Sequence, residues 1–304
     1  MSKPSDLFAA VSALLKAAVA DSTQATYETC WESFRTFLFT IALDCTLPVP
    51  PHLVGLYIAY LYQHNYKAPT IRTHLSALAY PHNMLGLKDP TNSFLVSKLL
   101  KGVSVLIPSG DVRLPVTLDI LNSLMPVISQ SARNLYEAKL YKAMCCIAFY
   151  GFMRCSEICK SQHCLQLSQV KFQGTSHFTI SMTSFKHNTE GNLFTLRLNS
   201  KSEVSCPVAN LTSYLQMRGL QQGPLFCSLI GAPISATTFR NRLKLFFAIL
   251  GLDSKHFKSH SFRIGAACHA LTLGRTENEI QILGRWASPP ALRKYLRVAG
   301  LHGL

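Results

Sequence analysis

Four side chains near the end of the chain have the types and the spacing that phosphodiester chemistry requires. His260 and Arg263 stand at positions i and i+3, so a helix would place them on one face. Trp286 and Tyr295 follow on either side of a Pro-Pro pair. An arginine fork can hold two phosphate oxygens, a tyrosine hydroxyl can attack phosphorus, and a histidine can move the proton. This segment therefore predicts a phosphate-binding site that contains a nucleophile.

A further arginine, Arg154, interrupts the apolar run CCIAFYGFMRCSEIC. A guanidinium in apolar surroundings is costly unless it is paired or meets an anion. Glu157 follows one helical turn later and can orient the Arg154 side chain. Two interpretations are open on these residues, a structural ion pair and a second phosphate ligand.

Metal-dependent chemistry is not favoured, because carboxylates are scarce. Residues 108–304 hold only 9 acidic residues without a clear cluster, whereas a two-metal nuclease needs several that converge. Nucleotide-binding glycine loops and the H-E-x-x-H zinc motif are also missing from the sequence. Cys155, Cys159, His163 and Cys164 include zinc-ligand types, but their spacing favours packed, reduced thiols. We therefore expect no metal and no cofactor.

The charge of the chain is strongly positive and unevenly distributed. The net charge is +15, with 8 basic and 6 acidic residues in 1–107 against 22 and 9 in 108–304. A globular protein with this balance usually binds a polyanion, either nucleic acid or an anionic membrane surface. The sequence contains no apolar run of 18 residues, so a membrane-spanning helix is not expected. Residues 102–117, rich in Gly and Pro, predict a linker between domains 1–107 and 108–304.

The periodicity predicts a helical first domain and a mixed second one. The opening segment reads as an amphipathic helix, with a secretory signal as the alternative. One strand pair is expected, a hairpin with its loop near 184–192. Helices are expected over residues 25–43, 52–63, 69–86, 92–102, 118–127, 134–150, 206–218, 235–250, 259–273, 277–283 and 290–298.

The motifs of the second domain resemble those of the tyrosine recombinases, the phage-integrase-like site-specific recombinases. The family motif G-[LM]-R-x-x-E reads here GFMRCSE, over Gly151–Glu157, with one extra residue before the arginine. The family's H-x-[LF]-R box is present as HSFR, which ends at Arg263. The late element L-G-x-[HW] reads LGRW, and Tyr295 follows Trp286 by nine residues, as the nucleophile does in the family.

This resemblance implies a fold, a reaction and a set of roles. The fold would be mainly α with a small β-sheet, in which a helical, SAM-like core-binding domain and a catalytic domain clamp double-stranded DNA. The reaction would be cleavage and rejoining of DNA through a 3′-phosphotyrosyl intermediate, without metal. The resemblance gives the attack to Tyr295, phosphate binding to Arg154 and Arg263, acid–base chemistry to His260, protonation of the leaving oxygen to Lys186, packing and hydrogen bonding to Trp286, and support to Glu157.

Some assignments stay open at this point. Lys186 fits the hairpin-loop position of the family's catalytic lysine, but Lys171 and Lys201 are close in sequence and His187 is adjacent. Arg240, Arg242 and Lys244 form a basic run on a predicted helix, which suits either a solvated face or a DNA-backbone contact. Arg72 and His74 are candidate DNA contacts from the first domain.

Two other functions remain as alternatives. Only nine residues follow Tyr295, which is short for docking onto a neighbouring subunit, so a domesticated DNA-binding protein without cleavage activity is one. A monomeric relaxing enzyme like topoisomerase IB is the other. By resemblance we expect a homo-oligomer, a tetramer on DNA, and no membrane partner. The spelling of the late motifs is most similar to recombinases of eukaryotic DIRS-like or Crypton-like mobile elements, which would place the protein in a nucleus; another host would place it in the cytoplasm.

Overall fold

The chain forms two compact units, Met1–Asp111 and Val112–Leu304. The computed structural model describes residues 4–108, 110–186 and 188–296. His187 and the tail after Leu296 therefore lie outside the described residues, and the predictions made for them stay predictions. The unit boundary falls close to the one predicted after residue 107. In the described part of the chain, no helix has both the length and the apolar character needed to cross a bilayer.

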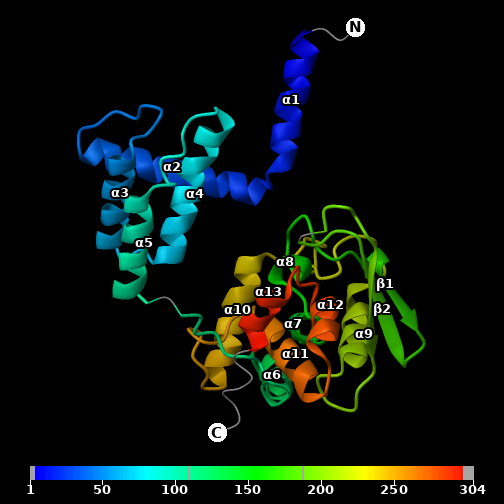
Figure 1. Cartoon of the computed structure of the whole chain (residues 1–304). Helices are drawn as coiled ribbons and strands as arrows, with labels where there is room; N and C mark the ends of the chain where they lie inside the picture. Colours follow the sequence, from blue (N-terminus) through cyan, green and yellow to red (C-terminus); the bar gives the residue numbers. More distant parts are fainter. Residues whose placement is uncertain (1–3, 109, 187, 297–304) are drawn as a thin grey trace. The chain divides into compact units, whose positions relative to one another are not determined.

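The first unit consists of helices (Figure 1). α2 packs on α4, and α3 packs on α5. Phe34, Tyr57 and Ile71 are completely buried in the shared core. Proline stands at the first helical positions of α3 and α4, as the sequence predicts for Pro69, whereas Pro51 begins α3 one residue before the expected start. The helices are α1 (Pro4–Ala18), α2 (Asp21–Thr40), α3 (Pro51–Gln63), α4 (Ala68–Met84) and α5 (Phe94–Leu106).

Two features of the first unit differ from expectation. α5 continues through Gly102 to Leu106, because its apolar positions keep a helical period beyond the glycine. His74 is buried, and its Nδ1 lies 2.8 Å from the Tyr57 hydroxyl, so its prediction as a DNA contact is wrong. Arg72, two residues earlier on α4, is exposed.

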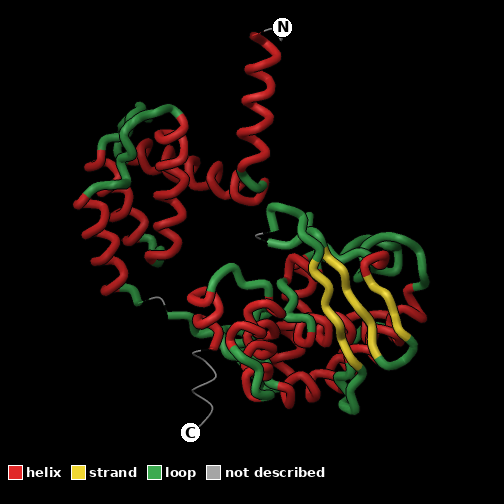
Figure 2. Tube along the Cα trace, turned by 45° about the vertical axis from the view of Figure 1, so that its right-hand side comes forward, coloured by secondary structure: helices red, strands yellow, loops and turns green. Residues whose placement is uncertain are grey.

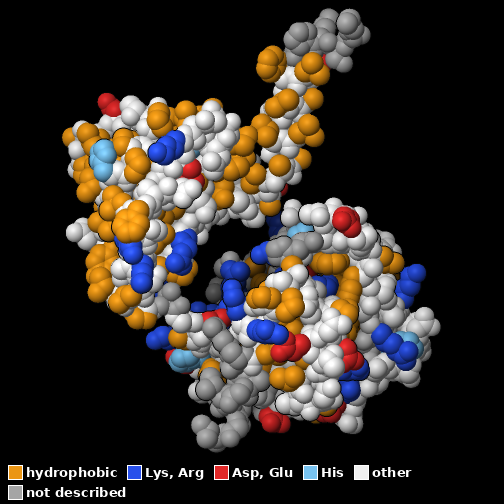
Figure 3. Space-filling model, viewed as in Figure 1, with side chains coloured by type: hydrophobic (Ala, Val, Ile, Leu, Met, Phe, Trp, Pro, Cys, Tyr) orange, Lys and Arg blue, Asp and Glu red, His pale blue; other side chains and the backbone are white. Residues whose placement is uncertain are grey.

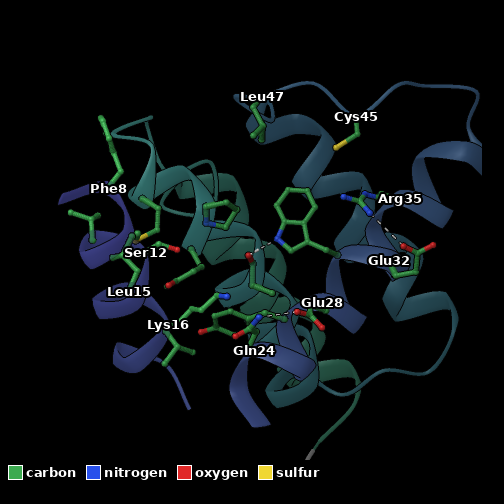
Figure 4. A pocket seen from close by; sticks show the side chains of 18 residues that line it. Phe8, Ser12, Leu15, Lys16, Gln24, Glu28, Glu32, Arg35, Cys45 and Leu47 are labelled. Atoms are coloured by element: carbon green, nitrogen blue, oxygen red, sulfur yellow. Dashed lines mark hydrogen bonds and ion pairs between the residues drawn. The ribbon is translucent and has the colours of Figure 1, made fainter. Parts of the chain in front are cut away.

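A pocket of the first unit lies between α1, α2 and α4 (Figure 4). It has a volume of about 1030 Å³, and Phe8 and Leu15 of α1 form one wall. α1 exposes apolar side chains along much of its length (Figure 3). None of the residues predicted to act on a phosphate lines this pocket.

The second unit is built around α7, a helix buried on nearly every side. α9, α6 and α11 pack against it. Asn134 caps its start by accepting a hydrogen bond from the Glu137 amide. The helices of this unit are α6 (Leu118–Ser131), α7 (Leu135–Tyr150), α8 (Cys155–Ile158), α9 (Pro207–Arg218), α10 (Ala236–Ile249), α11 (Ser261–Thr272), α12 (Glu277–Gly284) and α13 (Pro289–Leu296).

A three-stranded antiparallel sheet lies along one side of the second unit (Figure 2). Its strands are β1 (Val170–Gln173), β2 (His177–Met182) and β3 (Phe194–Asn199), with β2 in the centre. β2 and β3 form the predicted hairpin, which pairs Ile180 with Leu196. The alternation of buried and half-buried residues in β2 explains why this strand was predictable. β1 was not predicted, because it has only four residues, VKFQ, and three of them are exposed.

Close backbone contact fixes the position of α11, the helix that carries Arg263. A Cβ on Gly265 would lie only 1.8 Å from the carbonyl oxygen of Val116. The Val116 amide donates to the Ser261 carbonyl at 3.0 Å. Glycine at position 265 therefore lets the entry segment of the second unit lie directly against the start of α11.

Candidate active site

Arg154 is positioned by a tight turn between α7 and α8. Phe152 adopts a left-handed backbone with a φ of 50°, which reverses the chain after α7. The Glu157 carboxylate then accepts hydrogen bonds from the Arg154 amide at 2.8 Å and from its guanidinium at 3.0 Å. Arg154 stays partly exposed, while the Glu157 side chain is completely buried. The predicted pairing of Arg154 with Glu157 is therefore present, and it holds the arginine at the surface of the unit.

Arg263 lies inside the protein beside the same turn. Its side chain is only 1% exposed, and it donates to the backbone carbonyls of Phe152 and Gly284. The centre of its guanidinium lies 4.1 Å from the ring centroid of Trp286, a cation–π contact. Burial, together with the positive charges of Arg154 and Arg285, lowers the pKa of Arg263 to about 9. An anion next to this group would favour its charged form.

Arg285 is a site residue that the sequence motifs did not single out. It ends α12 in a left-handed conformation with a φ of 55°. Its guanidinium donates to the Glu157 carboxylate at 2.8 Å, and its carbonyl oxygen accepts from Arg154 at 2.9 Å. Burial lowers the pKa of Arg285, and the nearby Arg154 adds to this effect. The only sequence signal for it was the additional charge inside the LGRW element.

These contacts gather more positive than negative charge. In the described part of the chain, the guanidinium groups of Arg154, Arg263 and Arg285 surround a single carboxylate, that of Glu157. Burial alone would raise the pKa of Glu157, but Arg285, Arg154 and Arg263 bring it below its ordinary value. Glu157 is therefore an anion, and two positive charges remain uncompensated.

Several buried donors of the cluster also lack acceptors. Among the described residues, the Nε atoms of Arg263 and Arg285 and the Nε1 atom of Trp286 are buried without a hydrogen-bond partner. Buried polar atoms are normally hydrogen-bonded, so each unpaired donor in a protein needs an explanation. The excess charge and the unpaired donors are both features that an oxyanion would satisfy.

The tyrosine and the histidine meet at this cluster. The Tyr295 hydroxyl lies 2.7 Å from Nε2 of His260, within hydrogen-bonding distance. The Tyr295 ring packs on Trp286 with 5.2 Å between the ring centroids. Tyr295 also acts to raise the pKa of Arg263, against the larger effect of burial. His260 is the residue directly before α11, and Tyr295 lies on α13. Six residues predicted from the sequence thus converge: Arg154, Glu157, His260, Arg263, Trp286 and Tyr295.

Replacing Gly284 with alanine is expected to displace Trp286. A Cβ on Gly284 would lie 1.6 Å from an indole carbon of Trp286, so the ring must move. Overpacking of this kind costs about 1–3 kcal/mol of stability. In a Trp31→Phe background, where Trp286 is the remaining tryptophan, we expect the fluorescence of Gly284→Ala to shift to longer wavelength as the indole meets water. Emission identical to that of the background protein would contradict this packing.

Lys186 lies in the loop between β2 and β3. The preceding residue, Phe185, places its ring 5.8 Å from the Arg285 guanidinium, and Phe194 at the start of β3 lies 5.1 Å from it. The base of the hairpin therefore rests on the arginine cluster, while the Lys186 side chain is exposed. Its identity as the catalytic lysine stays a prediction.

A cationic cleft adjoins His260. It has a volume of about 520 Å³, and Cys155 and Ser259 also contribute to its wall. Its basic residues come from the segment before α6, from α10 and from the loop before α11: Arg113, Arg240, Lys244 and Lys258.

Arg242 does not join the cleft, although it belongs to the same basic run. Its guanidinium donates to the Glu137 carboxylate at 2.9 Å and to the Ser131 carbonyl at 3.1 Å. It also contacts the rings of Tyr141 and Phe246. Arg242 therefore connects α10 to α6 and α7, and the structure gives it a packing role in place of the predicted DNA contact.

Comparison with known families agrees with this geometry. The model of the phage integrase family matches residues 118–302, more than half of the chain and all of the converging residues. The chain belongs to the phage integrase family. The tyrosine recombinase family predicted from the sequence is thereby confirmed, and with it the family's activity, DNA cleavage and rejoining through a tyrosine. No curated protein matches the chain in sequence.

Solved structures of this family share the fold at low sequence identity. The XerH site-specific recombinase, in a post-cleavage complex with a difH substrate, is 14% identical with a TM-score of 0.67, over 91% of this chain and 76% of its own. A λ integrase dimer on a core site is 14% identical with a TM-score of 0.66, over 94% and 74%. The Tn1549 transposon integrase with circular intermediate DNA is 12% identical with a TM-score of 0.66, over 94% and 92%. The predicted fold, mainly helical with a small sheet, is confirmed.

Proposed function

We propose that this tyrosine recombinase cuts and rejoins duplex DNA by linking Tyr295 to the 3′-phosphate of a broken strand. The observation that carries the proposal is the Tyr295 hydroxyl, bonded to His260 beside a cluster that has two uncompensated positive charges. A phosphodiester passing through a five-coordinate state gains negative charge on its non-bridging oxygens. Preorganised guanidinium donors stabilise that charge, since they need not reorient when it develops.

Each converging residue then has a role in the reaction. Tyr295 attacks the phosphorus and forms the P–O bond, while His260 accepts the phenolic proton. Arg154 and Arg263 hold the non-bridging oxygens, and the Trp286 indole adds an N–H donor. The bond to the 5′-oxygen breaks, and Lys186 supplies its proton. In the reverse step a 5′-hydroxyl attacks the phosphotyrosine, so the covalent bond conserves the energy needed for rejoining.

Glu157 and Arg285 act on this site through Arg154. Arg285 shares the Glu157 carboxylate and offers its own carbonyl to Arg154, so two sides of the Arg154 guanidinium are fixed. A guanidinium held in this way loses less freedom when phosphate binds. We therefore assign both residues to positioning, without contact to the reacting atoms.

DNA is the partner that this site requires. The neighbours XerH, λ integrase and Tn1549 integrase were solved with DNA, and the λ integrase as a dimer, which supports a DNA-bound oligomer here. We infer that the active assembly on DNA is a tetramer. In a eukaryotic host, as for a DIRS-like or Crypton-like element, the protein would act in the nucleus, and in another host it would act in the cytoplasm.

A covalent-trapping assay on a nicked duplex separates the proposed function from its two rivals. Loss of the short strand beyond the nick prevents rejoining, so the chain is expected to stay attached to the labelled 3′-phosphate end. A DNA-binding protein without cleavage activity would give no adduct. With supercoiled plasmids that carry two target sites, we expect recombinant circles; relaxed circles alone would indicate a topoisomerase and refute strand exchange.

The salt dependence of DNA binding tests the cationic cleft. Arg240 is exposed on α10 and lines this cleft, so Arg240→Gln should remove about one counterion-release contact. We expect the slope of log K against log salt to fall by roughly one unit. Arg197→Gln makes the same change on β3, where the side chain is exposed and bonded to Asn199. If Arg240→Gln and Arg197→Gln give the same slope of log K against log salt, the cleft is not part of the DNA-binding surface.

A further inference from the structure

Two cysteines lie in contact beside the catalytic arginine. The sulfur atoms of Cys155 and Cys159 are 3.8 Å apart, across the single turn of α8 that follows Arg154. Residues four apart in a helix are separated by about 6 Å along its axis. That separation lies within the range of Cα distances that a disulfide spans. These thiols can therefore be joined without unwinding the unit.

The two thiols differ in exposure. Cys155 is half-buried and lines the cationic cleft, where a small solute can reach it. Cys159 is buried, with 1% of its surface exposed. This arrangement pairs an accessible sulfur with a protected one, the order that a two-step oxidation requires.

The surroundings also give the two sulfurs different proton affinities. The hydrogen bond with Cys159 lowers the pKa of Cys155, Ser259 and Arg240 lower it further, and burial opposes the change. The same contact with Cys155, together with burial, raises the pKa of Cys159. The thiolate is the nucleophilic form of cysteine. By contrast, burial raises the pKa of Cys145 and Cys146, which are therefore inert.

We propose that Cys155 and Cys159 form a redox-active modification site, which a small hydroperoxide oxidises to an intramolecular disulfide. The Cys155 thiolate attacks the peroxide, so an S–O bond forms, the O–O bond breaks and hydroxide leaves. The product is a sulfenic acid on Cys155. The Cys159 thiol then attacks that sulfur, the S–S bond forms, and the hydroxyl leaves as water with the Cys159 proton. One peroxide thus removes two electrons from the pair.

Peptide mass after mild oxidation tests this proposal. The full chain is reduced, freed of reductant and treated with equimolar hydrogen peroxide before digestion with trypsin. Cleavage after Arg154 and Lys160 leaves both cysteines in the peptide CSEICK, residues 155–160. We expect this peptide to lose the mass of two hydrogen atoms before Cys45 is modified. Cys45 is an exposed thiol of the first unit. Oxidation of Cys45 first, or a peptide that stays reduced, would overturn the proposal.

Single substitutions assign the order of the two steps. Cys159→Ser should stop the reaction at the sulfenic acid, which dimedone then labels on Cys155. Cys155→Ser should leave Cys159 unlabelled, because the buried thiol does not react alone. Thermal unfolding of each variant shows whether it is folded. The mass of the CSEICK peptide from the unsubstituted chain tests the disulfide even if a variant does not fold. Label on Cys159 in the Cys155→Ser variant would reverse the assignment and contradict the proposal.

The disulfide has a consequence for the cleavage reaction, which rests on the proposed function. A disulfide brings the two sulfur atoms from 3.8 Å to about 2.05 Å, which must shift the single turn of α8. Arg154 is the residue directly before this turn. A displacement near 1 Å can slow a reaction about a hundredfold. We expect the oxidised chain to lose cleavage by this factor and to regain it with a dithiol reductant. Full cleavage of DNA by a chain whose CSEICK peptide is oxidised would refute this consequence. The mass of that peptide is measured without DNA, so it tests the disulfide independently of the proposed function.

Discussion

Tyr295→Phe is expected to abolish the covalent DNA adduct completely while DNA binding stays within about twofold. The substitution removes one hydroxyl, which is the proposed nucleophile and the partner of His260 at 2.7 Å. The ring contact with Trp286 does not involve that oxygen, so the packing of α13 is retained. Adduct formation on a nicked duplex and the dissociation constant for an intact one measure the two properties separately.

Tyr150→Phe is the matched control for this variant. Tyr150 is also half-buried in the second unit, and its hydroxyl lies 3.3 Å from that of Ser205. Its loss should cost about 1 kcal/mol of stability and leave adduct formation intact. Adduct on the Tyr295→Phe protein, or equal loss in both variants, would remove Tyr295 from the reaction.

Arg263→Lys is expected to slow the first cleavage turnover about a hundredfold to a thousandfold. That range follows from the loss of one preorganised donor to a developing oxyanion. Lysine keeps the charge but has no planar fork, so it cannot bond the Phe152 and Gly284 carbonyls and a phosphate together. We expect DNA affinity to change little, because the affected interaction strengthens in the transition state. Single-turnover rates beside dissociation constants check this separation.

Arg242→Lys controls for the general effect of replacing a buried arginine. Arg242 is 16% exposed and ion-paired with Glu137, but it lies outside the cluster. We expect it to lower the melting temperature and to leave the cleavage rate of the folded protein within a few-fold. If the cleavage rate falls by the same factor in Arg263→Lys and Arg242→Lys, Arg263 acts through stability and the proposed phosphate contact is wrong.

The parts of the fold that the sequence could predict are those set by local signals. Helix α7 was predictable from its length and its Asn134 cap, although it is buried all round and has little amphipathic period. The hairpin of β2 and β3 followed from alternation. α8 has four residues and β1 is an exposed edge strand, so neither produces a pattern long enough to detect. Their existence depends on tertiary contacts.

The candidate site shows the same division between local and long-range information. The spacings of His260 to Arg263 and of Trp286 to Tyr295 lie within short motifs, and a single sequence therefore reveals them. The pairing of Arg154 with the Arg285 carbonyl joins residues 131 positions apart, which no local pattern encodes. Arg285, whose backbone is left-handed, also reaches the carboxylate of Glu157 from 128 positions away. The contacts of Arg285 were for this reason invisible in the sequence, whereas the pairing of Arg154 with Glu157 spans three residues and was predicted.

The most direct measurement is the identity of the residue that carries DNA in the trapped complex. After nuclease and trypsin digestion, cleavage behind Lys294 and Arg297 leaves Tyr295 in a tripeptide, Tyr-Leu-Arg. The proposed attack of Tyr295 on phosphorus predicts that this tripeptide bears a phosphate or a short nucleotide on the phenolic oxygen. A phosphate attached to any other side chain, or cleaved DNA with no attached peptide, would contradict it.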